Sequence, residues 1–154
     1  MHKDLMVKDF REKVISLEEK MACLPGSTGP EAYPLLHQFA DGLYIRKVSV
    51  PKGHLVVTKI HKKAHPFFML KGEVSVLTTN GVERFTAPYY AVTKAGTKRV
   101  IYMHEDVEWV TVHATQDTDL EEIEKDLIAK DYSELDQYLD KQDAARLVDI
   151  LKEE

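Results

Sequence analysis

Eight short β-type segments between residues 43 and 114 limit what this chain can fold into. They are rich in Val, Ile, Thr, Tyr and Phe, and Pro, Gly, Asn or charged clusters separate them. In order they are LYIRKVSV, HLVVTKIH, HPFFML, EVSVLTT, VERFTA, YYAVTKA, RVIYM and VEWVTVHA. No helical pattern interrupts them, and parallel strands would need such crossovers. The region therefore predicts a mainly β fold, an antiparallel barrel or double-sheet jelly roll.

The dipeptide Asn80-Gly81 makes the sharpest local prediction inside this region. It lies between EVSVLTT and VERFTA, and both of its residues tolerate the positive φ angles that tight turns require. We therefore predict a β-hairpin with a two-residue turn at this point.

Helical patterns flank the β region. Apolar residues recur every three or four positions in residues 4–22, and again in DTDLEEIEKDLIAKD, SELDQYLDK and DAARLVDILKE. Thr118 or Asp119 is placed to cap the first of these three C-terminal segments. We predict four parts: an N-terminal helix at 1–24, a turn-rich lead-in at 25–42, the β-barrel at 43–116 and an acidic helical extension at 117–154.

Charge is strongly segregated along the chain. Residues 44–104 carry eleven Lys or Arg and two acidic residues, whereas residues 119–154 carry five basic and thirteen acidic residues. The acidic tail can neutralise the basic region within one fold, or the basic region can attract an anionic ligand. Charge alone favours the first interpretation, because most charged residues form solvated faces.

Several classes of protein are disfavoured by composition. The sequence has no apolar run long enough to span a membrane, and its first residues alternate charges where a signal peptide would be apolar. We therefore expect a cytoplasmic protein that does not enter membranes. Cys23 is the only cysteine, which excludes an intrachain disulfide and a Cys-rich zinc site. Basic residues without an aromatic RNA-binding signature disfavour nucleic acid as a partner.

Candidate ligand residues gather in TKIHKKAHPFFMLKGEV, residues 58–74, where His61 and His65 are four residues apart. The pair can belong to a metal site completed by another ligand, to an anion site, or to a barrel with no ligand. His104 and His113 are further, weaker metal candidates. His104 lies in an HED turn that suits a solvated residue, and His113 shares strand parity with Trp109, so it faces either the interior or solvent.

The segments PKGHLVVTKIHKKAHPFFMLKGEVSVLT and APYYAVTKAGTKRVIYMHEDVEWVTVH resemble the paired motifs of the cupin superfamily. The resemblance covers residues 39–123 and is greatest to small single-domain cupin proteins of bacteria and their phages. It implies a small antiparallel barrel with a site inside its mouth. Because many cupins are dimers, it also implies a homodimer.

The resemblance also assigns positions to the candidate ligands. Metal-binding cupins carry His-x-His, then a Glu and a glycine, with one more His in the second motif. With Gly72 as the glycine, His65 falls where the family has Glu, and His61 matches the second His of the pair. Lys59 stands where the first His would be, and Arg99 where the last would be.

Lys59 and Arg99 argue against a metal in this alignment. Lysine binds metal only as the neutral amine, and arginine almost never loses its proton. We therefore predict that Lys59, His61, His65 and Arg99 bind an anionic small molecule, a carboxylate, phosphate or nucleotide. One alternative is a metal-dependent enzyme of dioxygenase or isomerase type that holds Fe, Mn, Zn or Ni at His61 and His65. The other is a structural or assembly protein whose barrel mouth is unused.

Overall fold

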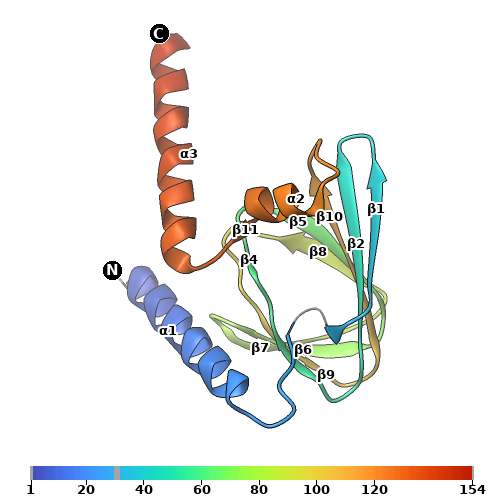
Figure 1. The fold of residues 1–154 in the computed structure, drawn as a ribbon. Helices are drawn as coiled ribbons and strands as arrows, with labels where there is room; N and C mark the ends of the chain where they lie inside the picture. Colours follow the sequence, from blue (N-terminus) through green and yellow to red (C-terminus); the bar gives the residue numbers. More distant parts are fainter. Residues whose placement is uncertain (1, 30–31, 154) are drawn as a thin grey trace.

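The computed structural model describes residues 2–29 and 32–153, and it is mainly antiparallel β (Figure 1). Helix α1 (His2–Ala22) comes first, and ten strands follow between Leu35 and Ala114. The chain continues through α2 (Leu120–Leu127), the short strand β11 (Ile128–Ala129) and α3 (Tyr132–Glu153). The fold class predicted from the sequence, a β-barrel with helices at both ends of the chain, is confirmed.

Antiparallel pairing organises the strands into two main sheets. The larger has the order β1 (Leu35–Ala40), β2 (Leu43–Val50), β10 (Val107–Ala114), β5 (His65–Lys71) and β8 (Tyr89–Thr93). The smaller has the order β3 (Leu55–Val57), β9 (Val100–Met103), β6 (Glu73–Thr78) and β7 (Gly81–Thr86). Strand β4 (Ile60–His61) pairs with β11 as a separate two-stranded ribbon.

The two main sheets share one apolar core, made of Val50, Met69, Val74, Val76, Ile101, Met103 and Val107. Alternation along each strand decides which side chains enter it, because successive residues point to opposite faces. In β5, His65, Phe67 and Met69 are buried while the residues between them are exposed. The odd-numbered residues of β5 therefore face the interior.

The larger sheet begins earlier than predicted. Strand β1 lies inside residues 25–42, the predicted lead-in, and pairs with β2 from Leu35↔Val48 to Ala40↔Leu43. All of its residues after Leu35 are exposed, since it forms the edge of the sheet. An edge strand buries little on either face, so LLHQFA lacks the alternation that reveals a strand in sequence.

The predicted hairpin exists, one residue earlier than expected. Strands β6 and β7 pair through Leu77↔Val82 and Thr78↔Gly81, so the turn is Thr79-Asn80 and Gly81 opens β7 at φ 112°. The Thr78 hydroxyl stabilises this register. It donates to the Gly81 carbonyl at 2.9 Å and accepts from the Asn80 N–H at 3.2 Å.

Two C-terminal helices form where three were predicted. Asp119 caps α2 as expected, and its carboxylate accepts from the Glu121 N–H at 2.9 Å. The second and third predicted helices are one continuous helix, α3, that runs through Asp143. Because no Gly or Pro interrupts residues 133–153, Asp143 remains an internal helix residue and caps nothing.

Helix α2 closes one end of the barrel (Figure 1). Its Ile123 and Leu127 pack on Tyr44 of β2 in a second apolar cluster. Acidic residues of the tail pair with basic residues beside β4: Glu124 with Lys59, Asp126 with Lys63 at 3.0 Å, and Glu134 with Lys62 at 3.2 Å. The acidic tail therefore neutralises part of the basic region inside one fold.

Helix α1 lies against the start of α3. Arg11 pairs with Asp136 at 3.0 Å and stacks over the Tyr132 ring, and Glu18 pairs with Lys98 at 2.9 Å. The far part of α3 extends away from the barrel (Figure 1). Among the described helices, none is both long and apolar enough to cross a membrane.

Candidate metal centre

Three histidines meet inside the barrel at the end covered by α2. His61 ends β4, His65 begins β5, and His113 lies in β10. One side-chain nitrogen from each ring lies within 4.8 Å of the other two. The ring centroid of His65 is 4.4 Å from those of both His61 and His113, and the latter two are 5.7 Å apart. The His65 ring therefore lies between the other two and close to both.

Strand register explains why residues so far apart in sequence meet. In the β5–β10 ladder Thr111 pairs with Phe67, so two residues further along the antiparallel strands His113 comes opposite His65. Both side chains point inward and are buried. His61 arrives from β4, which β11 holds through Ile128↔His61.

Hydrogen bonds orient two of the rings. His65 Nδ1 lies 3.2 Å from the Lys63 carbonyl, which only accepts, so Nδ1 carries the proton and Nε2 keeps the lone pair. His113 Nε2 lies 2.9 Å from the Thr111 hydroxyl. A proton on Nε2 donated to that hydroxyl leaves Nδ1 of His113 as the ligand atom. Such second partners are typical of metal-binding histidines.

All three histidines are neutral at physiological pH. Burial is the main cause, and it lowers the pKa of His61 to about 3 and that of His113 to about 4. Burial also lowers the pKa of His65, and the positive charge of Arg99 acts in the same direction. Neutral imidazoles have free lone pairs, so a metal ion need not displace protons to bind.

Solvent reaches the cluster. None of the described hydrogen bonds uses the His61 ring, yet no fully buried side-chain nitrogen or oxygen in the described chain lacks a partner. The His61 ring nitrogens are therefore in contact with solvent.

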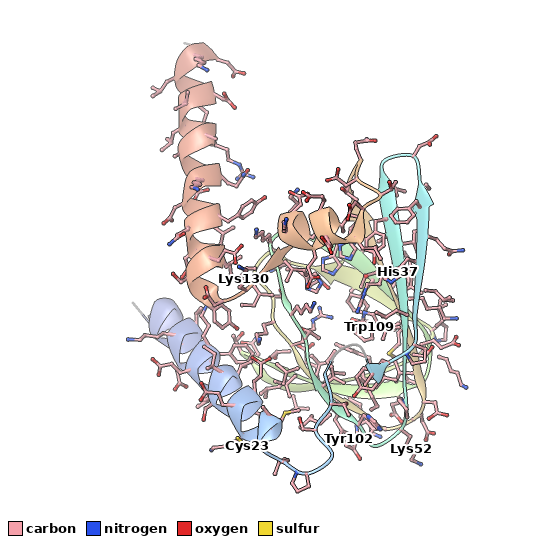
Figure 2. The ribbon with its side chains drawn as sticks, in the orientation of Figure 1. Cys23, His37, Lys52, Tyr102, Trp109 and Lys130 are labelled. Carbon is pink, nitrogen blue, oxygen red and sulfur yellow. The ribbon has the colours of Figure 1, made fainter. Side chains whose placement is uncertain are left out.

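Two arginines lie beside the three histidines. Arg99 precedes β9, and its guanidinium carbon lies 4.7 Å from the Phe67 ring centroid and 5.9 Å from that of Trp109. Figure 2 labels Trp109 within the barrel. Arg46 lies on β2 opposite Thr111, and its charge lowers the pKa of both His61 and His113. Burial lowers the pKa of both guanidiniums.

The sequence analysis named Arg99 as a candidate ligand residue and did not name Arg46. The available signal was the period-two pattern in LYIRKVSV, where Tyr44 and Val50 are buried and Arg46 has the same parity. An inward arginine between buried residues marks a polar site more clearly than the resemblance does.

Lys59, a predicted ligand residue, lies outside the cluster. It lies between β3 and β4, and its ammonium pairs with Glu124 of α2. The two side chains are 47% and 56% exposed. An acidic partner on the covering helix holds Lys59 at the surface, so Lys59 adds no charge inside the barrel. The third imidazole comes from His113.

His104 is also apart from the cluster. Its Nε2 lies 2.7 Å from the Ser75 hydroxyl, and its ring meets Tyr102 edge to face. Tyr102 lies at the end of the barrel opposite α2 (Figure 2). His104 follows β9 at that end, so only the other weak candidate, His113, joins His61 and His65.

No protein-family model and no curated protein matches this sequence. Solved structures that resemble it include a cupin superfamily protein from Desulfitobacterium hafniense, with 13% identity and a TM-score of 0.43 over 53% of this chain and 77% of that one. The cupin domain of a transcriptional regulator from Enterobacter cloacae matches with 9% identity and a TM-score of 0.45, over 53% and 94% of the two chains.

An acetylacetone dioxygenase from Acinetobacter johnsonii matches with 19% identity and a TM-score of 0.44, over 56% of this chain and 65% of that one. Cupin proteins, both enzymes and regulators, thus stand among the structures that this chain resembles. At TM-scores below 0.5 these similarities assign neither activity nor ligand. The bacterial or phage origin that the resemblance implies stays a prediction.

Proposed function

We propose that this chain binds a divalent transition-metal ion through His61, His65 and His113 and presents it to a small molecule. The meeting of three neutral imidazoles from three separate strands is the observation that supports this function. Neutral histidine is the commonest metal ligand. Three histidines whose nitrogens converge are explained better by a shared metal ion than by a structural role.

The donor set fits such an ion. Zinc–nitrogen bonds of 2.0–2.1 Å place the ligand atoms of a tetrahedral site about 3.3 Å apart. The three nitrogens already lie within 4.8 Å of one another, so small ring rotations close the site. Imidazole suits Zn, Fe and Ni better than Mn. Of the four metals predicted from the sequence, we therefore expect Mn to bind most weakly.

Three protein ligands leave at least one coordination position free. Structural zinc sites use four protein ligands, whereas catalytic sites use three and bind water or substrate in the remaining position. A metal held here by the three histidines would act as a Lewis acid on that substrate. We therefore favour the metal-dependent enzyme of dioxygenase or isomerase type over a barrel that binds an anion without metal.

Metal analysis tests the proposal directly. Protein expressed without a His-tag and stripped with a chelator is titrated with Zn²⁺, Fe²⁺, Ni²⁺ and Mn²⁺ by isothermal titration calorimetry. We expect one ion per chain, with Zn²⁺, Fe²⁺ or Ni²⁺ bound more tightly than Mn²⁺. His61→Ala removes a ligand and should abolish stoichiometric binding.

His54→Ala is the matched control, because His54 bonds to the Tyr33 hydroxyl at 3.0 Å, away from the cluster. It should leave metal binding unchanged. Absence of binding in the unmodified chain, or equal binding by His61→Ala, would refute the metal centre.

Self-association is a second candidate function, favoured by exposed apolar side chains on the outer face of the larger sheet. Leu70 is 55% exposed, Tyr90 75% and Val92 65%, and all three lie on the neighbouring strands β5 and β8. A second copy of this chain can cover that face as a homodimer. Light scattering tests this interface. A dimer that Tyr90→Asp dissociates would support it, and a chain that stays monomeric at high concentration would refute it.

A further inference from the structure

Below the three histidines, the strands present a second set of inward side chains. Phe67 follows His65 on the inner face of β5, and Thr111 precedes His113 on β10. Arg46 of β2 is directly opposite Thr111 in the ladder. Consecutive inward residues are about 7 Å apart along a strand. Arg46 therefore enters the barrel one side-chain step from the histidine cluster.

Arg99 brings a second guanidinium to the same level. It lies over Phe67, whose ring stacks on Trp109 with centroids 4.4 Å apart. The face of an aromatic ring attracts a cation, so this stack fixes the position of the guanidinium. Its charge lowers the pKa of His61 and His65, which places it within electrostatic range of both.

Within the described part of the chain, neither guanidinium has an acidic partner. Among the described residues, no ion pair and no side-chain hydrogen bond involves the guanidinium of Arg46 or Arg99. Glu124 acts on Arg46 only at longer range, and Lys59 already binds its carboxylate. Glu83 acts on Arg99 in the same way, at longer range.

Both guanidiniums keep donors that no described residue occupies. No fully buried side-chain nitrogen in the described chain lacks a hydrogen-bond partner, so the unpaired nitrogens of Arg46 and Arg99 contact solvent. A dication on three neutral imidazoles beside two guanidiniums concentrates positive charge in a largely buried space. Such charge is costly unless a counter-ion compensates it.

We infer that the small molecule bound at this centre is a small oxyanion, a carboxylate or phosphate, that coordinates the metal and accepts hydrogen bonds from Arg46 and Arg99. This inference rests on the proposed metal centre. An arginine fork matches two oxygens of a carboxylate or phosphate, which a neutral molecule of the same shape does not offer. The two arginines therefore select for negative charge, and the metal selects for an oxygen at one end.

Cobalt provides a test that separates metal binding from anion binding. The full chain is loaded with Co²⁺, whose visible absorption reports its ligands, and titrated with oxalate, inorganic phosphate and neutral oxamide. We expect oxalate or phosphate to change the spectrum and bind at least tenfold more tightly than oxamide. The stronger of the two identifies the carboxylate or the phosphate as the preferred group.

Variants assign the anion to the arginines. Arg46→Gln and Arg99→Gln should each weaken binding of the preferred anion at least tenfold, because each removes a charged donor. Neither should weaken Co²⁺ binding, and loss of a neighbouring cation should strengthen it. Lys59→Gln removes one positive charge outside the cluster and should leave anion affinity within twofold.

Arg46→Lys and Arg99→Lys keep the charge and lose the fork, so they should give intermediate losses. If Arg99→Gln lacks a cooperative melting transition, because its contact with Phe67 is lost, Arg99→Lys replaces it. Failure of the unmodified chain to bind Co²⁺ refutes the metal centre and this inference together. If Co²⁺ binds normally but neither anion binds, the oxyanion inference alone is refuted. It is also refuted if all four arginine variants bind the preferred anion as tightly as the unmodified chain does.

Discussion

Histidine side chains are arranged differently at the two ends of the barrel. At the end away from α2, His54 bonds to the Tyr33 hydroxyl at 3.0 Å and His104 to the Ser75 hydroxyl at 2.7 Å. At the α2 end, three histidines lie close together, and the described hydrogen bonds leave the His61 ring without a partner. His54 and His104 each stand apart with a hydroxyl partner, whereas at the α2 end one nitrogen from each of three rings lies within 4.8 Å of the other two. The difference indicates which end is built for a ligand.

The same strands serve both ends. In β10, Val107 joins the apolar core near one end, and Trp109, Thr111 and His113 follow at two-residue steps toward the other. The barrel thus changes from an apolar core to a polar interior within a few inward positions. A packed core on one side gives the histidines a rigid support, which metal sites require.

Removal of a cluster histidine should have the largest effect. His113→Ala leaves two ligands, and we expect it to weaken metal binding by more than the roughly 100-fold that loss of an outer partner can cost. His104→Ala, at the other end, should change metal affinity by less than twofold. Calorimetric titration with Zn²⁺ measures both. Similar losses in the two variants would contradict the contrast between the ends.

The two hydroxyl partners offer a matched, smaller test. Thr111→Val removes the partner of His113 Nε2 and should weaken metal binding about 10-fold, because the ring loses its orientation. Ser75→Ala removes the corresponding partner of His104 and should leave metal affinity unchanged. Equal metal affinity in Thr111→Val and the unmodified chain would show that Thr111 does not position the ring.

Because its histidines are neutral, we expect the free energy of unfolding of the metal-free protein to depend on pH. Unfolded histidine has a pKa of about 6.5, and the folded values are about 3 for His61 and about 4 for His113. Below pH 6.5 the unfolded state therefore binds more protons, so the free energy of unfolding falls as the pH falls. The loss is at most about 1.4 kcal/mol per pH unit for each histidine.

Urea unfolding with EDTA at pH 7, 6 and 5 measures this slope. His61→Gln, which cannot titrate, should reduce it, and His104→Gln should not. A slope unchanged by His61→Gln would show that His61 is not held neutral in the native protein.

The smallest effect is expected at Lys59. Its ion pair with Glu124 is largely exposed, so Lys59→Gln should cost at most about 1 kcal/mol of stability, and less at high salt. Metal affinity should not change. Thermal unfolding at 50 mM and 500 mM NaCl measures the loss of stability. A tenfold loss of metal affinity in Lys59→Gln would show that Lys59 belongs to the metal site.

The sequence predicted the elements whose local signals are strong. Alternation in VEWVTVHA and HPFFML, the hairpin between β6 and β7 and the cap at Asp119 all reflect interactions between residues close in the chain. It failed for β1, because an edge strand buries little, and for the break predicted at Asp143, because one cap-type residue does not stop a helix. The first failure concerns a segment whose state depends on its neighbour β2, and the second concerns a helix that no Gly or Pro interrupts.

By itself the sequence identified His61 and His65, four positions apart, as candidates for one site. Only the tertiary structure decided that His113 joins them, that Arg46 enters the same space, and that Lys59 turns outward to Glu124. The physical reason is register. The pairing of β10 with β5 and β2 sets which side chains share a level inside the barrel, and it depends on core packing between residues far apart in the chain.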